Sequence, residues 1–127
     1  MEKNPDIQFH SPEEIKLYQE ARLTETLVYL QAHSRFYQQM FKEHSIDITR
    51  IKKIEDLQQI PVTTKTDLQL HNSEFICVDP DGIIDYVTTS GTLGDPVTFV
   101  LTSKDLDRLA YNEYLSFNTA GCSRHDI

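Results

Sequence analysis

The sequence predicts an α/β fold in which helices come first and a β-hairpin with a final helix follows. In residues 11–72, capped segments with apolar residues at helical spacing indicate a helical lead-in. In residues 75–127, two runs rich in β-branched residues surround glycine, proline and hydroxyl residues, and a helical pattern comes next. At 127 residues the chain is expected to form at most one domain, with enough length to bury a core.

The first predicted helix begins at Ser11, which is followed by Pro12 and, three positions after the serine, by Glu14. Serine with a glutamate three residues later forms a capping box, and proline suits the first helical position. Apolar side chains then recur at helical spacing, at Ile15, Tyr18, Leu23, Leu27 and Leu30. After a pause near His33, a second helix is expected with Ser34 as its cap. It carries apolar residues that we expect to pack in the core and not to bind a ligand: Phe36, Tyr37, Met40 and Phe41.

Shorter elements are predicted before the hairpin. A short helix is expected over residues 51–57, and Thr64 with Asp67 has the spacing that caps another turn or two of helix. Residues 75–78 are predicted to form a short strand. In residues 79–82, proline and glycine stand where a type I turn places them.

The predicted hairpin spans residues 83–101. Its strands are residues 83–87 and 97–101, and the turn chemistry between them places residues 89–94 at an exposed tip. The last helix is expected to open at Ser103 and to stop at Gly121. Its inward face is predicted to consist of Leu106, Leu109, Ala110, Tyr114 and Phe117.

The connection between the predicted strands reads Thr-Thr-Ser-Gly-Thr-Leu-Gly-Asp-Pro, residues 88–96. Glycine lets a ligand approach the backbone, neighbouring amides can form an anion-binding concavity, and hydroxyls add donors. The loop is therefore suited to gripping a phosphate chain, although an ordinary hairpin connection also uses glycine and proline. It is not a Walker loop, because two residues separate Gly91 from Gly94 and no lysine follows. It is not a dinucleotide fingerprint, because a strand resumes where a helix would begin.

Composition restricts the classes of function. The formal net charge of −8 disfavours a nucleic-acid or anionic-membrane surface, since either would call for a basic patch. No apolar run has the length of a membrane span, and the N-terminus lacks the apolar stretch of a signal peptide. Cys77 and Cys122 form neither a CxxC pair nor a disulfide framework, which favours a reducing cytoplasm.

The sequence does not indicate catalytic or metal-binding residues. No metal site is predicted, because the histidines show no ligand spacing among themselves or with the cysteines: His10, His33, His44, His71 and His125. Nothing resembling a nucleophile elbow precedes Ser90, and no Ser–His–Asp set can be assembled. Lys65 and Lys104 are expected to be solvated helix charges.

Residues 89–96 resemble the Thr-Ser-Gly-Thr-Thr-Gly-x-Pro signature of the adenylate-forming enzymes, which include the acyl-CoA and aryl-CoA ligases. Residues 33–37 and 61–68 also resemble ligases of the phenylacetate-CoA type, and the likeness extends from about Leu27 onward. The resemblance implies that the ATP phosphates are held by Thr89, Ser90, Gly91, Thr92 and Gly94. Leu93 stands where the family commonly has threonine or serine, and Val97 stands where many members have lysine.

The resemblance implies that residues 1–127 are the N-terminal, incomplete portion of an AMP-binding (adenylation) domain. The parent protein is then expected to be a cytoplasmic acid–CoA ligase that uses ATP, magnesium and CoA. It would convert a small carboxylic acid, such as an aryl acid, into an acyl-adenylate and then into a CoA thioester. The family's magnesium-binding glutamate, ribose-binding aspartate and catalytic lysine are expected outside these residues, so the chain alone is expected to be inactive.

Two alternatives stay open at the level of sequence. A related adenylating enzyme would pass the acid to another acceptor, such as a protein or an amine. A non-catalytic nucleotide- or partner-binding module would carry a similar loop. With its apolar helix faces uncovered, the isolated chain is expected to be marginally folded or to form a homo-oligomer through apolar or strand-edge contacts.

Overall fold

The computed structural model describes residues 7–90, 95–123 and 126. The chain divides into two compact units, Met1–Cys77 and Val78–Ile127. The first unit is helical, and the second holds the hairpin and the last helix. This division has the same order as the helical lead-in and the strand-containing part that the sequence predicts.

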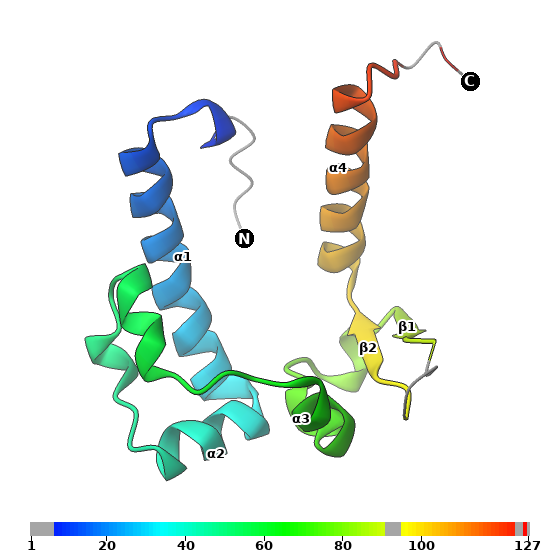
Figure 1. Ribbon diagram of the computed structural model, residues 1–127. Helices are drawn as coiled ribbons and strands as arrows, with labels where there is room; N and C mark the ends of the chain where they lie inside the picture. The colour runs from blue at the N-terminus through cyan, green and yellow to red at the C-terminus, as the bar shows by residue number, and fades with distance from the viewer. Residues whose placement is uncertain (1–6, 91–94, 124–125, 127) are drawn as a thin grey trace. The chain divides into compact units, whose positions relative to one another are not determined.

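The first unit begins with a short 3₁₀-helix, η1 (Ile7–Phe9), and the long helix α1 (Pro12–His33). Ser11 caps α1 in a complete capping box with Glu14, as predicted. Ser34 ends α1 and caps α2 (Arg35–Glu43) through its side chain, so the predicted pause is also confirmed. Figure 1 shows the two helices joined by this short break.

The core of the first unit lies where α1 meets α2 and the segment after it. Its buried members are Leu27, Phe41, Ile48 and Ile51, with Leu23, Tyr37, Ile46 and Ile60 packed against them. Full burial of one such side chain contributes about 1.5–3 kcal/mol. The apolar residues that the sequence assigns to the inner face of α1 are all buried or half-buried.

Four short elements complete this unit: η2 (Ile48–Arg50), η3 (Ile54–Gln59), α3 (Lys65–Leu70) and η4 (Asn72–Phe75). The short helix predicted at residues 51–57 is found as η3, which begins three residues later than predicted. It begins there because the carboxylate of Asp56 accepts hydrogen bonds from the backbone amides of Lys52 and Lys53. The predicted cap of α3 by Thr64 and Asp67 is confirmed as a capping box.

The strand predicted at residues 75–78 is wrong. Phe75 ends η4, and the phenyl ring of Phe75 stacks on that of Phe36 with 4.0 Å between ring centroids. The Ser34 hydroxyl donates to the carbonyl of Glu74, and the Tyr29 hydroxyl donates to the carbonyl of Cys77. The Tyr29 hydroxyl therefore satisfies a carbonyl that a strand over residues 75–78 would offer to a neighbouring strand.

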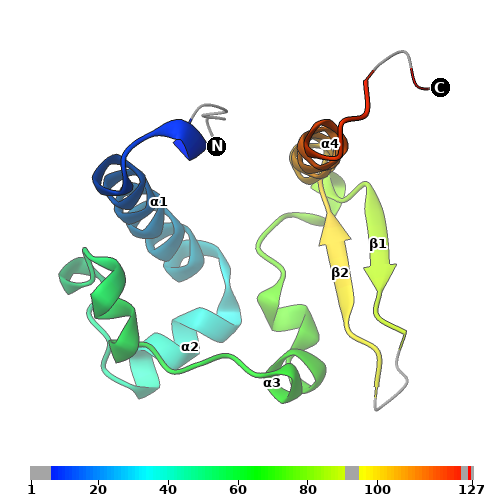
Figure 2. The same ribbon diagram turned by 45° about the horizontal axis from the view of Figure 1, so that its top comes forward.

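The second unit opens with η5 (Pro80–Gly82), in which the amide of Gly82 donates to the carbonyl of Asp79 at 2.9 Å. This bond is the one expected of the predicted turn. Strands β1 (Asp85–Thr88) and β2 (Thr98–Leu101) then pair antiparallel, as predicted, with Asp85 opposite Leu101 and Thr88 opposite Thr98. Figure 2 shows the two arrows side by side and α4 continuing from the end of β2.

Helix α4 (Ser103–Thr119) begins at a capping box formed by Thr102 and Asp105 and is followed by Gly121, whose φ is +83°. Both ends agree with the sequence prediction. The predicted inward face is wrong, because all five of its residues are exposed, including Tyr114 at 54% and Phe117 at 59%. Tyr111 and Leu115 are half-buried in their place.

The hairpin does not cover the apolar face of α4, since Leu106 and Leu109 in its first turns are 38% and 42% exposed. A 17-residue helix is about 26 Å long, whereas a four-residue strand is about 13 Å long. The hairpin is therefore too short to cover the whole length of the helix. Among the described residues, no helix has the length and apolar character needed to cross a membrane.

Candidate functional site

The candidate phosphate-binding loop connects β1 to β2. The structure describes Thr89 and Ser90 where the loop begins, and Asp95 and Pro96 where it ends. The predicted site residues Gly91, Thr92 and Gly94, together with Leu93, lie outside the described residues. The structure thus places two of the five predicted phosphate-binding residues at the start of the loop.

Thr89 joins the two ends of the loop through its backbone and its side chain. Its backbone amide donates to the carbonyl of Val97 over 3.0 Å, and its Oγ1 accepts from the amide of Val97 over 3.0 Å. Val97 is only 2% exposed, so its amide lies in a buried part of the chain. The hydroxyl proton of Thr89 is not used in this bond and can still be donated to a ligand.

The remaining described loop residues, Ser90, Asp95 and Pro96, are exposed. The loop and its surroundings carry no positive side chain in the sequence: residues 78–103 include four aspartates and neither lysine nor arginine. A phosphate bound here would therefore depend on backbone amides and hydroxyl donors, which suit such a ligand without a formal charge.

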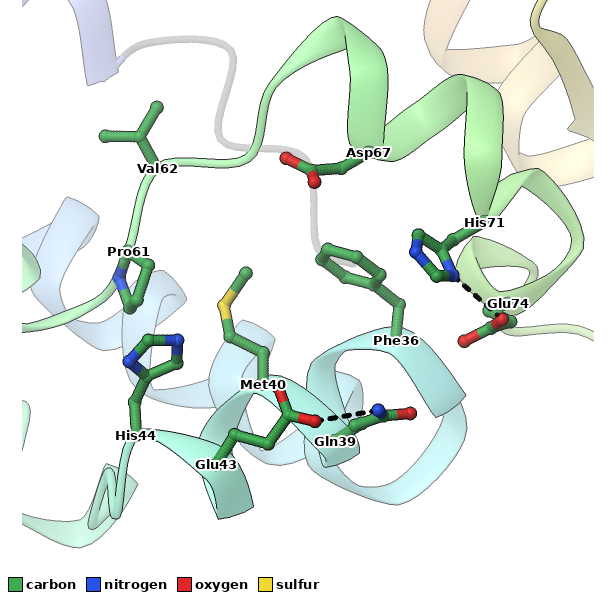
Figure 3. A pocket seen from close by; sticks show the side chains of 10 residues that line it. All are labelled: Phe36, Gln39, Met40, Glu43, His44, Pro61, Val62, Asp67, His71 and Glu74. Carbon is green, nitrogen blue, oxygen red and sulfur yellow. Dashed lines mark hydrogen bonds and ion pairs between the residues drawn. The ribbon is translucent and has the colours of Figure 1, made fainter.

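A second candidate site is a pocket of about 260 Å³ in the first unit. Figure 3 shows apolar and polar side chains around it, contributed by α2, the segment after η3, α3 and η4. The side chains that line the pocket are Phe36, Gln39, Met40, Glu43, His44, Pro61, Val62, Asp67, His71 and Glu74. Sequence reasoning did not find this pocket, because its residues come from four separate segments and follow no shared spacing.

The carboxylates of this pocket already have partners inside the first unit. Asp67 accepts from the hydroxyl and the amide of Thr64, and these bonds lower the pKa of its carboxyl group. Glu74 lies 3.0 Å from Nδ1 of His71, and Glu43 accepts from the side chain of Gln39 at 2.8 Å. Such pairing is typical of groups that stabilise a fold, so the pocket does not offer an obvious acid–base pair.

The histidines that the structure describes do not form a set of metal ligands. His44 and His71 line the pocket, His10 lies 3.7 Å from Glu14, and His125 falls outside the described residues. Within the described part of the chain, no three histidine, cysteine, aspartate or glutamate residues are grouped closely enough to hold a metal ion.

Comparison with known proteins identifies proteins whose sequences are similar to that of this chain. No protein-family model matches the sequence. The phenylacetate-coenzyme A ligase of Thermus thermophilus is 30% identical over 118 residues, which are 92% of this chain and 26% of that protein. The enzyme of the same name from Escherichia coli K12 is 29% identical over 122 residues, or 94% of this chain and 28% of that protein.

This chain is related to the phenylacetate-CoA ligases. It spans about a quarter of the length of these curated relatives. The resemblance to ligases of the phenylacetate-CoA type, which the sequence predicts, is thereby confirmed.

The solved structures agree with this assignment to the CoA ligases. A 2-hydroxyisobutyryl-CoA ligase in complex with 2-HIB-AMP and CoA has a TM-score of 0.77 and 26% identity, over 85% of this chain and 24% of that one. An open conformation of the same ligase has the same TM-score at 24% identity, and this second match shows the fold alone. The helical unit and the hairpin unit therefore have part of the fold of an adenylate-forming CoA ligase.

Proposed function

We propose that this chain supplies the ATP phosphate-binding loop of an AMP-forming acid–CoA ligase. In the first step a carboxylate oxygen attacks the α-phosphorus of ATP, the bond from that phosphorus to the bridging oxygen breaks, and pyrophosphate leaves. In the second step the thiol of CoA displaces AMP from the acyl-adenylate and forms a thioester. The role of residues 89–94 is to hold the β- and γ-phosphates so that the α-phosphorus faces the carboxylate.

The observation that carries this proposal is the position of the loop sequence on a paired hairpin in a chain related to CoA ligases. Thr89 and Ser90 stand at the end of β1, and β2 resumes one residue after Val97. The bonds between Thr89 and Val97 hold the two ends of the loop together. Donors held in place at a reacting group accelerate a reaction through positioning and through stabilisation of developing charge.

The proposal also names the other components of the reaction. The substrate is a small carboxylic acid, such as an aryl acid, and CoA accepts the acyl group. Magnesium is expected to accompany ATP, and we assign it no ligand and no step, because the described residues contain no metal-ligand cluster. We further propose a cytoplasmic enzyme that does not act on nucleic acid or membranes and that can associate with itself.

ATP–pyrophosphate exchange, measured on the longest natural form of the protein, tests the reaction. A panel should include phenylacetate, 2-hydroxyisobutyrate, benzoate and medium-chain fatty acids. We expect exchange that depends on one class of acid, followed by thioester formation when CoA is added. Exchange without thioester formation would favour a ligase with another acceptor. Nucleotide binding without exchange for any acid would favour a non-catalytic module and would contradict the proposal.

A further inference from the structure

The bond between Thr89 and Val97 departs from a regular antiparallel ladder. In a hydrogen-bonded antiparallel pair, each residue donates its amide to the carbonyl of the residue opposite. Thr89 follows this rule as a donor, since its amide reaches the carbonyl of Val97 at 3.0 Å. The amide of Val97, however, donates to the side chain of Thr89, at 3.0 Å from Oγ1. A hydroxyl oxygen thus takes the place that a backbone carbonyl has in the ladder.

This substitution has a structural consequence for the loop. Val97 is 2% exposed, and a buried amide without an acceptor is strongly disfavoured. Since Oγ1 of Thr89 is the acceptor, the peptide group after Thr89 is released from the ladder and the backbone can turn into the loop. Both ends of the seven-residue connection between Thr89 and Val97 are then fixed to one another.

We propose that Thr89 is a positioning residue, whose hydroxyl oxygen holds the amide of Val97 and thereby fixes the two ends of the loop. This inference rests on the proposed phosphate role of the loop and assigns Thr89 a task that the resemblance does not. The hydroxyl proton of Thr89 is not used in this bond and can still be donated to a phosphate.

Amide hydrogen exchange of Val97 in the 127-residue chain, without nucleotide, tests the anchoring itself. Thr89→Val removes the acceptor while keeping the shape of the side chain. We expect the Val97 amide to exchange about tenfold faster, which corresponds to about 1.4 kcal/mol. Thr89→Ser keeps the acceptor and should retain the protection. Thr88→Val, one residue earlier on the exposed strand β1, is the matched control and should leave Val97 exchange unchanged. Unchanged exchange in Thr89→Val would overturn the proposal.

An amide-to-ester replacement at residue 97 separates positioning from direct phosphate contact. The corresponding α-hydroxy acid removes the N–H of Val97 and leaves the Thr89 hydroxyl intact. In pyrophosphate exchange by the longest natural form, we expect the KM for ATP to rise about tenfold while the KM for the acid stays the same. An unchanged KM for ATP would show that Thr89 acts only through its own contact and would overturn the positioning role.

The two experiments also separate this inference from the proposed function. If the longest natural form catalyses no exchange with any acid, the proposed function fails, and the protection of Val97 then decides the anchoring on its own. If exchange occurs and Thr89→Val leaves Val97 protected, the proposed function stands and the inference fails.

Discussion

Ser34 is the residue whose replacement should destabilise the first unit most directly. It is fully buried, with 0% exposure, and its hydroxyl serves two elements. Its Oγ accepts from the amide of Tyr37 as the cap of α2 and donates to the carbonyl of Glu74 after α3. Ser34→Ala removes both bonds and leaves the backbone unchanged.

The expected loss of stability follows from these two bonds. Loss of a helix cap typically costs about 1 kcal/mol, and loss of one further hydrogen bond costs about 1 kcal/mol. We therefore expect Ser34→Ala to lower the free energy of unfolding of the first unit by about 2 kcal/mol. Ser11→Ala is the matched control, because Ser11 caps α1 from an exposed position and, among the described residues, its side chain bonds to Glu14 of the same capping box. It should lower the free energy by only about 1 kcal/mol.

Urea unfolding followed by NMR intensities of first-unit amides measures both variants in the same chain. The reasoning predicts a difference of about 1 kcal/mol between them, with unchanged dependence on urea concentration. If Ser34→Ala and Ser11→Ala destabilise the unit equally, the bond from Ser34 to the carbonyl of Glu74 contributes nothing to stability and the reasoning is refuted.

Three further predictions concern pH, association and activity. Hydrogen bonds from the backbone amide and the hydroxyl of Thr102 lower the pKa of Asp105. The ionised carboxylate of Asp105 therefore stabilises the fold above about pH 4, and this stabilisation is lost as the pH falls through the lowered pKa. Asp105→Asn should remove this part of the acid dependence of the free energy of unfolding, measured with urea. The exposed apolar face of α4 should cause concentration-dependent association, which sedimentation measures. Leu109→Glu should reduce this association, whereas the control Asn112→Glu, at an exposed polar position, should leave it unchanged. A chain that is monomeric at all concentrations would contradict this prediction. The purified 127-residue chain should show no acid-dependent pyrophosphate exchange, and measurable exchange would show that the chain carries a complete active site.

Local signals in the sequence predict most of the fold. The caps at Ser11, Ser34 and Thr64 each depend on residues within three positions, so they can be recognised without knowledge of the tertiary structure. The hairpin is equally local, because turn residues separate two β-branched runs.

The errors arise where distant residues decide the outcome. Residues 75–78 have strand-like composition, but Phe75 stacks on Phe36 and the Tyr29 hydroxyl binds the carbonyl of Cys77. Propensity is a weak guide where such tertiary contacts compete with it. Which face of α4 is buried likewise depends on the element that packs against the helix. The periodicity of the sequence does not indicate which element that is.

The candidate site also combines a feature that the sequence predicts with features that only the structure shows. The loop sequence indicates the kind of ligand, whereas the bond from the Val97 amide to Oγ1 of Thr89 becomes visible only in three dimensions. The pocket around Met40 and His71 could not be predicted, because it requires the packing of α2 against later segments.

Pyrophosphate exchange by Gly91→Val in the longest natural form tests the central claim most directly. A side chain at Gly91 would block the approach of phosphate to the backbone, and we expect the exchange rate to fall by about 100-fold with the fold retained, as judged by circular dichroism. Gly82→Ala is the control, since a Cβ at Gly82 meets no atom within 4 Å, and it should exchange at the wild-type rate. A folded Gly91→Val protein with the wild-type exchange rate would contradict a phosphate-binding role for the loop.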